Sequence, residues 1–237
     1  MIFTFWEGKM PDYIKMCIKT WKFKHIILNY DNLCEFTDIP IQKIRRYTLP
    51  QIADIVRVHV LRDNGGYWLD ADTIMLSDKL PKENILGYSN GSRSHTIGFL
   101  HTEANSDMYI KWAEYQDKKI NGKVPDQANL WDAFGNSFTD WYVYQHKEIT
   151  IGDITNRWPE TYMIADKGIR RSAKYNTFYF NTSHKLSDLR DTDMLMLHNS
   201  WTPNWYKQLS EDDIMTNIDN VRMANNCTLS NIFKEVL

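Results

Sequence analysis

The chain has 237 residues, which is long for one minimal domain and short for two full ones. Its hydrophobic fraction of 43% and charged fraction of 24% are typical of a globular protein and exclude a disordered or fibrous one. The formal net charge is −2, which gives no general attraction to nucleic acid, so we expect no nucleic-acid partner.

The cysteines and the apolar runs indicate where the protein works. The three cysteines are far apart and show no zinc-like or Cys-x-x-Cys spacing, which favours a reducing compartment. Residues Met1–Met10 contain neither the basic segment nor the long apolar core of a signal peptide. No run approaches the roughly 18 apolar residues that span a bilayer. We therefore expect a cytoplasmic protein, and peripheral association with the inner face of the membrane stays open.

The first predicted elements follow a β-α-β order. The apolar run Ile2–Trp6 predicts a short strand. Apolar residues at three- and four-residue spacing across Pro11–Phe23 predict a helix, and His25–Tyr30 predicts a second strand. This order is typical of a parallel sheet flanked by helices.

A longer helix and a strand then lead to two carboxylates. The apolar spacing across Gln51–Asp63 predicts a helix, and Asn64–Gly66 ends it because glycine is favoured just after a helix C-terminus. The apolar strand Tyr67–Leu69 follows, and Asp70 and Asp72 come directly after it. Ligands bind at the carboxyl ends of strands in open α/β sheets, so we expect a binding site here.

The remaining sequence predicts further strands and helices of the same domain. Ile85–Ser89 and Thr96–Leu100 have the pattern of two strands joined through the turn residues Asn90–Gly91. The other expected elements are helices Ser106–Lys119 and Pro125–Phe134, a β-pair of Trp141–Gln145 with Glu148–Ile151, a strand Met194–Leu197 and a mostly helical tail Ser210–Leu237. Because no repeat or linker is visible, we predict one α/β domain over residues 1–237.

Two explanations fit the pair Asp70 and Asp72. Aspartate is common in a solvated turn after a strand. On an extended segment, however, side chains two residues apart face the same way, and two such carboxylates can share Mg²⁺ or Mn²⁺, which prefer oxygen ligands. The position directly after a buried strand favours the metal site.

Asp54 and Arg57 lie one helical turn apart in the helix before that strand. A solvated ion pair at this spacing would contribute little to stability. The surrounding residues are apolar, so an inward-facing pair is equally open. An inward pair could hold a polyhydroxyl ligand, because Asp accepts hydrogen bonds from hydroxyls and Arg donates to oxygen.

Three further segments carry polar or aromatic side chains at the ends of predicted elements. His198 ends the late strand and is either a structural residue or a further metal ligand. Asp126 and Gln127 stand at a helix start, where Asp is an ordinary residue. Phe5 and Trp6 end the first strand, and Trp6 either packs in the core or stacks on a nucleobase.

Taken together, these residues resemble glycosyltransferases of the GT-A fold, of the capsular polysaccharide synthesis and glycosyltransferase family 32 type. The resemblance lies in Phe5–Gly8 (FWEG) and in the Asp-x-x-Arg…Gly-Gly-x-x-x-Asp-x-Asp block of Asp54–Asp72. It covers residues 1–76 well and then thins to Asp126–Gln127 and His198–Trp201. It implies a Rossmann-like, mostly parallel sheet flanked by helices, with a small antiparallel β addition and a helical C-terminus. Residues 1–125 would form the nucleotide-sugar-binding half and 126–237 the acceptor-side half.

The resemblance also implies roles in binding the donor. Trp6, with Phe5 before it, would stack on the nucleobase of a nucleotide sugar. Asp54 and Arg57 would contact the hydroxyls and the diphosphate side of the transferred sugar. The pair Asp126–Gln127 would lie beside the anomeric carbon.

A second set of implied roles concerns the metal and the diphosphate. Asp72 would be the most direct metal ligand, and Asp70 would lie near the ribose and sugar and share the ion. His198 would be a further ligand, although similar bacterial toxins use an acidic residue there. Ser200 and Trp201 would bind the diphosphate or the metal shell.

The activity implied by the resemblance is a metal-dependent, retaining transfer of a hexose from a nucleotide sugar. We expect Mn²⁺ or Mg²⁺ as the cofactor and a UDP-sugar as the donor. The acceptor would be a glycan or a lipid-linked oligosaccharide of a surface or capsular polysaccharide.

Two other functions fit parts of the sequence. A haloacid-dehalogenase-like phosphatase would use Asp70–Thr73 (DADT) as its nucleophile motif. Its later acidic motif is matched only by Gly152–Arg157, where Arg157 replaces the second Asp. A non-catalytic carbohydrate-binding protein would use the many aromatic residues, but such modules are usually all-β.

Overall fold

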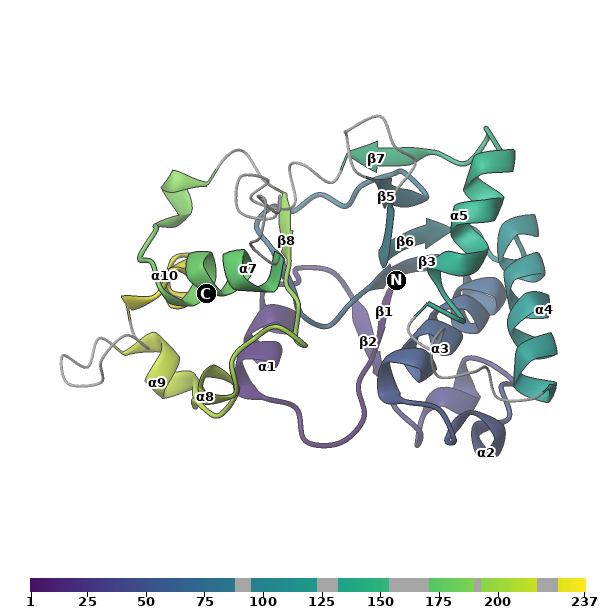
Figure 1. The fold of residues 1–237 in the computed structure, drawn as a ribbon, viewed down its shortest axis with the longest axis horizontal. Coiled ribbons are helices and arrows are strands. Elements are labelled where there is room, and N and C mark those ends of the chain that lie inside the picture. The colour runs from purple at the N-terminus through teal and green to yellow at the C-terminus, as the bar shows by residue number, and fades with distance from the viewer. Residues whose placement is uncertain (88–94, 123–131, 154–170, 190–192, 217–225) are drawn as a thin grey trace. The chain divides into compact units, whose positions relative to one another are not determined.

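The structure is a computed structural model (Figure 1). It describes residues 1–87, 95–122, 132–153, 171–189, 193–216 and 226–237. The chain forms two compact units. The sheet unit consists of Met1–Gly8, Phe23–Asp70 and Pro81–Ile154, and the helical unit of Lys9–Lys22, Ala71–Leu80 and Thr155–Leu237. These boundaries differ from the two predicted halves that meet at residue 125, and the organisation as a single domain stays a prediction.

A six-stranded sheet forms the centre of the sheet unit, with strand order β2-β1-β3-β6-β5-β7. Its strands are β1 (Ile2–Phe5), β2 (His25–Leu28), β3 (Gly66–Leu69), β5 (Ile85–Gly87), β6 (His95–Thr102) and β7 (Ile151–Asp153). The pairs β1–β2, β1–β3 and β5–β7 are parallel, whereas β3–β6 and β5–β6 are antiparallel. The predicted α/β class, with a mostly parallel sheet flanked by helices, is confirmed.

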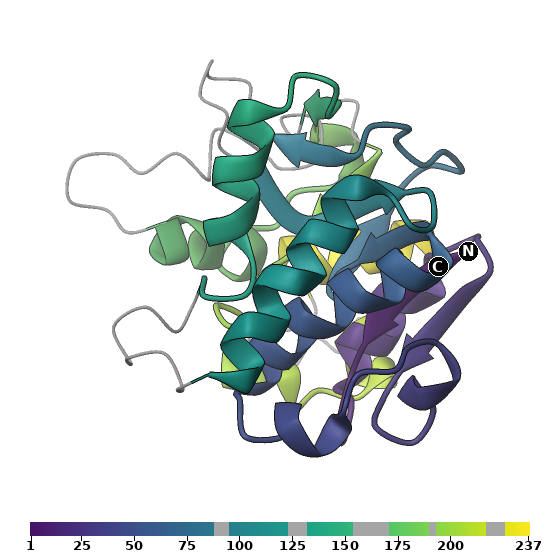
Figure 2. The same cartoon turned by 90° about the vertical axis from the view of Figure 1, so that its right-hand side faces the viewer.

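Helices cover this sheet. They are η1 (Leu33–Glu35), α2 (Ile41–Ile44), α3 (Leu49–Asn64), α4 (Asp107–Asn121) and α5 (Asn136–Gln145). Figure 2 shows α4 beside α3, with the sheet behind them. Helix α3 packs on β1 and β3, and α5 contacts both α4 and β6. The buried apolar side chains of these elements form one core.

The turn from α3 into β3 requires the two glycines that the sequence indicates. Gly65 and Gly66 have φ values of +64° and +92°, a region that residues with a side chain rarely adopt. A Cβ atom on Gly65 would lie 2.5 Å from Ala104 N, and one on Gly66 would lie 2.7 Å from Met1 O. The glycines therefore let β3 enter the sheet directly beside β1, which places its carboxyl end and Asp70.

The expected strand Trp141–Gln145 is wrong, because this segment belongs to helix α5. Its aromatic and β-branched residues favour a strand locally. However, the side chains of Phe138, Thr139, Tyr142 and Val143 are buried at helical spacing, and this packing decides the structure. Strand β7 begins only at Ile151.

The other expected elements are largely observed. The strands around the Asn90–Gly91 turn appear as β5 and β6, and the turn itself lies outside the described residues. Most of the expected helix Pro125–Phe134 also lies outside them, and residues 132–135 form turns.

The helical unit contains a small sheet in which β4 (Thr73–Met75) pairs antiparallel with β8 (Met194–Met196). Its helices are α1 (Asp12–Lys19), α7 (Arg171–Phe180), η4 (Leu186–Asp188), α8 (Asn204–Lys207), α9 (Glu211–Met215) and α10 (Thr228–Val236). The predicted antiparallel addition and helical C-terminus are thus confirmed. Within the described parts of the chain, none of the helices combines the length and the apolar character needed to cross a membrane.

Candidate active site

Asp54 and Arg57 form a buried ion pair on α3. Arg57 Nη2 lies 2.9 Å from Asp54 Oδ1, and the two side chains are only 5% and 12% exposed, respectively. Of the two arrangements left open by the sequence, the inward-facing one is therefore correct.

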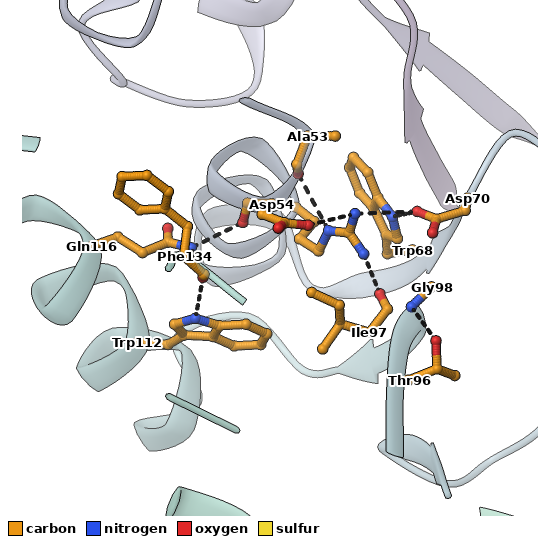
Figure 3. A network of polar contacts seen from close by, with 11 residues as sticks. Ala53, Asp54, Trp68, Asp70, Thr96, Ile97, Gly98, Trp112, Gln116 and Phe134 are labelled. Carbon is orange, nitrogen blue, oxygen red and sulfur yellow. Dashed lines mark hydrogen bonds and ion pairs between the residues drawn. The ribbon is translucent and has the colours of Figure 1, made fainter. Parts of the chain in front are cut away.

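Arg57 makes further contacts besides its pair with Asp54, and Figure 3 labels the partners Ala53, Asp70, Ile97 and Trp68. Its Nη2 lies 3.3 Å from Asp70 Oδ1, and its Nε donates to Ala53 O at 3.3 Å. Nη1 donates to Ile97 O on β6, and the guanidinium lies 5.1 Å from the centre of the Trp68 ring. Because the planar guanidinium has donors in fixed directions, these contacts hold it in one orientation. We call Asp54, Arg57, Trp68 and Asp70 the Arg57 cluster.

Asp70 is positioned by both its main chain and its side chain. Its backbone N–H donates to Gly98 O at 2.9 Å, which continues the pairing of β3 with β6. Trp68 Nε1 donates to Asp70 Oδ1 at 2.9 Å. The contacts to Trp68 and Arg57 both involve Oδ1, and the side chain is 38% exposed. The carboxylate is therefore oriented by the protein and accessible to a ligand.

Burial changes the ionisation of Asp54. Loss of water around the carboxyl group raises its pKa to about 7, although the Arg57 guanidinium lowers it. The carboxylates of Asp70 and Asp132 raise this pKa further. Burial thus favours the protonated form of Asp54, and the ion pair with Arg57 favours the carboxylate that can accept from a ligand hydroxyl.

In the helical unit, Asp72 lies beside the segment that contains His198. Leu197 N donates to Asp72 O at 3.0 Å, and Asn199 N donates to Asp72 Oδ2 at 2.7 Å. These bonds extend the pairing of β4 with β8. These two bonds lie on either side of His198 in the sequence. The structure therefore brings together the two segments that contain the predicted metal ligands Asp72 and His198.

The local geometry differs from one expectation. Ala71 and Asp72 form a turn, so the segment Asp70–Asp72 is not extended. The expectation of an extended segment is therefore wrong. Its spacing of two residues does not make the two carboxylates face the same way.

Aromatic rings surround His198. Its ring centroid lies 3.9 Å from that of Trp201 and 5.9 Å from that of Tyr175. His198 N donates to Tyr175 Oη at 3.2 Å, whereas Ser200 is exposed. The rings restrict the imidazole, and Ser200 remains accessible to solvent.

Tyr13 and Lys207 are residues of this region that the sequence did not identify. Tyr13 Oη donates to Asn199 Oδ1 at 2.5 Å, and burial together with Asp72 raises the pKa of Tyr13. Partial burial lowers the pKa of Lys207, and the nearby Asp72 carboxylate raises it. Neither residue stands in a recognisable motif. Tyr13 lies on α1 and Lys207 on α8, so both come near Asp72 only in the folded protein.

The other predicted site residues have different surroundings. Phe5 is buried in the core, and its ring meets Tyr30 edge-on at 5.8 Å. Trp6, directly after β1, is half-buried, and its backbone N–H donates to Leu28 O at 2.9 Å. The predicted pair Asp126–Gln127 lies outside the described residues.

Whether the site suits the predicted metal depends on the side-chain atoms that could bind it. Among the residues that the structure describes, no three His, Cys, Asp or Glu side chains form a group that could hold a metal ion. Asp70 does offer an oriented and accessible carboxylate, and carboxylate oxygens suit Mg²⁺ and Mn²⁺. The chemistry of this one carboxylate thus suits these ions, but the described residues do not provide a complete set of protein ligands.

The fold and the Arg57 cluster define an α/β protein with an acidic site, held by an arginine, at the carboxyl end of β3. The chain belongs to the capsular polysaccharide synthesis protein family, whose model matches residues 1–218. This confirms that part of the resemblance seen in the sequence, and the link to glycosyltransferase family 32 stays a prediction. The fold is also similar to a solved structure of PaToxG glycosyltransferase, with 15% identity and a TM-score of 0.45 over 61% of this chain and 67% of that chain. None of the curated proteins compared matches the chain.

Proposed function

We propose that this protein is a metal-dependent, retaining glycosyltransferase. It transfers a hexose from a nucleotide sugar, most simply a UDP-sugar, to a glycan or lipid-linked glycan during capsular polysaccharide synthesis. The observation that carries this proposal is the Arg57 cluster, in which a buried Asp54–Arg57 pair is joined to Asp70 at the end of β3. It occurs in a chain of the capsular polysaccharide synthesis family.

The Arg57 cluster suits a sugar. Asp54 and Asp70 can both accept hydrogen bonds from hydroxyls, and charge-assisted bonds of this kind are strong. Arg57 already contacts both carboxylates and two main-chain carbonyls, so its main role is to hold the two acids in place. Prior orientation of these groups lowers the cost of binding a flexible polyhydroxyl ligand.

The diphosphate of the donor would lie toward Asp72. Asp70 and Asp72 would hold Mn²⁺ or Mg²⁺, with His198 as a further ligand. When bound, the ion stabilises the negative charge that develops on the departing diphosphate. Ser200 and Trp201 would bind the diphosphate, and Trp6 would stack on the base.

The remaining roles concern the reacting carbon and the acceptor. Asp126 and Gln127 would lie beside the anomeric carbon, and retention of configuration would follow from attack on the face that the diphosphate leaves. The acceptor chain would be presented from the cytoplasm, with peripheral contact to the membrane if it is lipid-linked.

A thermal-shift panel tests the proposal. UDP-, GDP-, CMP- and dTDP-sugars are added with and without Mn²⁺, and we expect one of them to raise the Tm, with a larger rise in Mn²⁺. The Asp72→Asn variant should lose the Mn²⁺-dependent part of this rise. Asp78→Asn, an exposed position in the same unit, serves as the control.

The same panel separates the proposal from the phosphatase alternative. If no nucleotide sugar stabilises the protein but a phosphomonoester does, the transferase proposal is wrong. Turnover would then be followed as release of phosphate, which a glycosyltransferase does not produce from a phosphomonoester.

A further inference from the structure

A buried amide connects α4 to the Arg57 cluster. Gln116 is fully buried, and its Nε2 donates to Asp54 O at 2.9 Å and to Phe134 O at 2.6 Å (Figure 3). One side-chain amide thus joins the main chain of α3, at the position of Asp54, to the segment that leads into α5.

Neither carbonyl depends on Gln116 for a hydrogen bond. Trp112 Nε1 also donates to Phe134 O, at 2.9 Å. Asp54 lies inside α3, where a carbonyl accepts from the amide four residues later. The Oε1 atom of Gln116 is buried and has no hydrogen-bond partner among the described residues. Gln116 is therefore not needed to satisfy either carbonyl, and what its amide adds is a direct link between Asp54 O and Phe134 O.

The segment that Gln116 holds lies directly against the carboxylate of Asp54. A Cβ atom on Gly135 would lie 3.3 Å from Asp54 Oδ2 and would clash with the side chain of Ile97. The Gly135 main chain therefore packs on one side of the carboxylate, and Arg57 contacts Asp54 through Oδ1. Moving Phe134 away from Asp54 would loosen this enclosure.

We propose that Gln116 is a positioning residue for recognition of the donor sugar. By tying Asp54 O to Phe134 O, it fixes the Asp54 carboxylate between Gly135 and Arg57, in the orientation that a sugar hydroxyl meets. This inference rests on the proposed function, because the sugar contact of Asp54 belongs to that proposal. Gln116 itself touches neither the sugar nor the metal.

The test compares Gln116→Met with Lys119→Met. Lys119 lies one turn later on α4 and also holds this segment, through a bond from Nζ to Ala133 O at 2.9 Å. This bond does not involve Asp54. Affinities are measured by calorimetry for UDP, GDP, CMP and dTDP and for the corresponding nucleotide sugars, all with Mn²⁺. Urea unfolding gives the stability of each variant, and crystal structures give the distance from Asp54 Oδ1 to Arg57 Nη2.

We expect Gln116→Met to unfold at a urea concentration close to that of the wild type. Its affinity for the nucleotide sugar should fall roughly tenfold, while its affinity for the nucleotide stays unchanged, because only sugar contacts involve Asp54. Lys119→Met should bind both as the wild type does. Equal nucleotide-sugar affinity in Gln116→Met and wild type, or equal losses in the two variants, would overturn the inference.

The crystal structures distinguish failure of this inference from failure of the proposed function. If no nucleotide sugar binds the wild type, the proposed function fails. The positioning role is then supported by an Asp54–Arg57 distance that lengthens in Gln116→Met but not in Lys119→Met, and it is overturned by an unchanged distance.

Discussion

Arg57 Nη2 lies 2.9 Å from Asp54 Oδ1, and the same nitrogen lies 3.3 Å from Asp70 Oδ1. One guanidinium nitrogen therefore joins a carboxylate inside helix α3 to a carboxylate that follows strand β3. Two like charges placed close together repel each other, and the cation between them offsets this repulsion. The position of either acid thus depends on Arg57.

Replacement of Arg57 by lysine tests this dependence. An ammonium group is a compact donor and cannot contact two carboxylates and two carbonyls in the fixed directions of a guanidinium. We expect Arg57→Lys to lower the free energy of unfolding by about 1–3 kcal/mol and to weaken nucleotide-sugar binding at least roughly tenfold. Urea unfolding and calorimetry measure the two effects.

Arg62→Lys is the matched control, because Arg62 lies on the same helix and pairs with Asp38 and Asp63 nearer the surface. Ion pairs of this kind contribute about 0–1 kcal/mol, so the variant should be nearly as stable as the wild type. Equal losses in the two lysine variants would show that Arg57 has no special role.

The raised pKa of Asp54 predicts a dependence of stability on pH. The group titrates at about 7 in the folded protein and near its ordinary value of 3.8 when unfolded, so between these values the folded state binds more protons. Its contribution is complete below about pH 3.8 and is lost as the pH rises through 7. This loss can reach about 1.4 kcal/mol of unfolding free energy per pH unit, and we expect Asp54→Asn to remove it. Urea unfolding from pH 4 to 8 measures the effect. An unchanged pH profile in this variant would contradict the assignment.

His59, also on α3, should act in the opposite direction. It is buried, and burial lowers its pKa from 6.5 to about 4, although Asp117, 3.8 Å from Nε2, raises it. The folded protein keeps His59 neutral, so the stability it contributes is present above pH 6.5 and is lost as the pH falls toward 4. His59→Gln should remove that loss. The effects of Asp54 and His59 on the free energy of unfolding oppose each other between pH 4 and 6.5. Each single variant should therefore show a pH dependence of stability that is cancelled in the wild type. Stability that does not change with pH in either variant would exclude both pKa shifts.

Much of the sheet unit was predictable because its signals are local. The apolar spacing of Leu49–Asn64 and the glycines after it define α3 and the start of β3 within about 20 residues. The expected strand Trp141–Gln145 belongs to helix α5. Its aromatic residues favour a strand locally, whereas burial of Phe138 and Tyr142 against neighbouring elements favours a helix. Such packing partners come from distant parts of the chain.

The candidate site shows the same division. Asp54, Arg57, Asp70 and Asp72 stand in one spaced block, so the sequence identified them, and the structure shows that the first three are in contact. Gln116 could not be identified in this way. Its contacts join residues 62 and 18 positions away, and one glutamine in an amphipathic helix carries no signal of them.

Trp6 gives a final prediction, which concerns the nucleotide and not the sugar. The residue is half-buried directly after β1, where an indole ring can offer one face to a base. Stacking of a base on an aromatic ring contributes about 1–3 kcal/mol, so Trp6→Ala should weaken UDP binding by about fivefold or more. The loss should be the same for UDP and for the UDP-sugar, because the sugar does not meet this ring.

Two further variants serve as comparisons. Trp6→Phe should retain part of the affinity for UDP. Trp141→Ala, which removes a tryptophan that is 58% exposed on α5, should retain all of it. Calorimetry with Mn²⁺ measures each affinity, and unchanged UDP binding in Trp6→Ala would remove the stacking role from this residue.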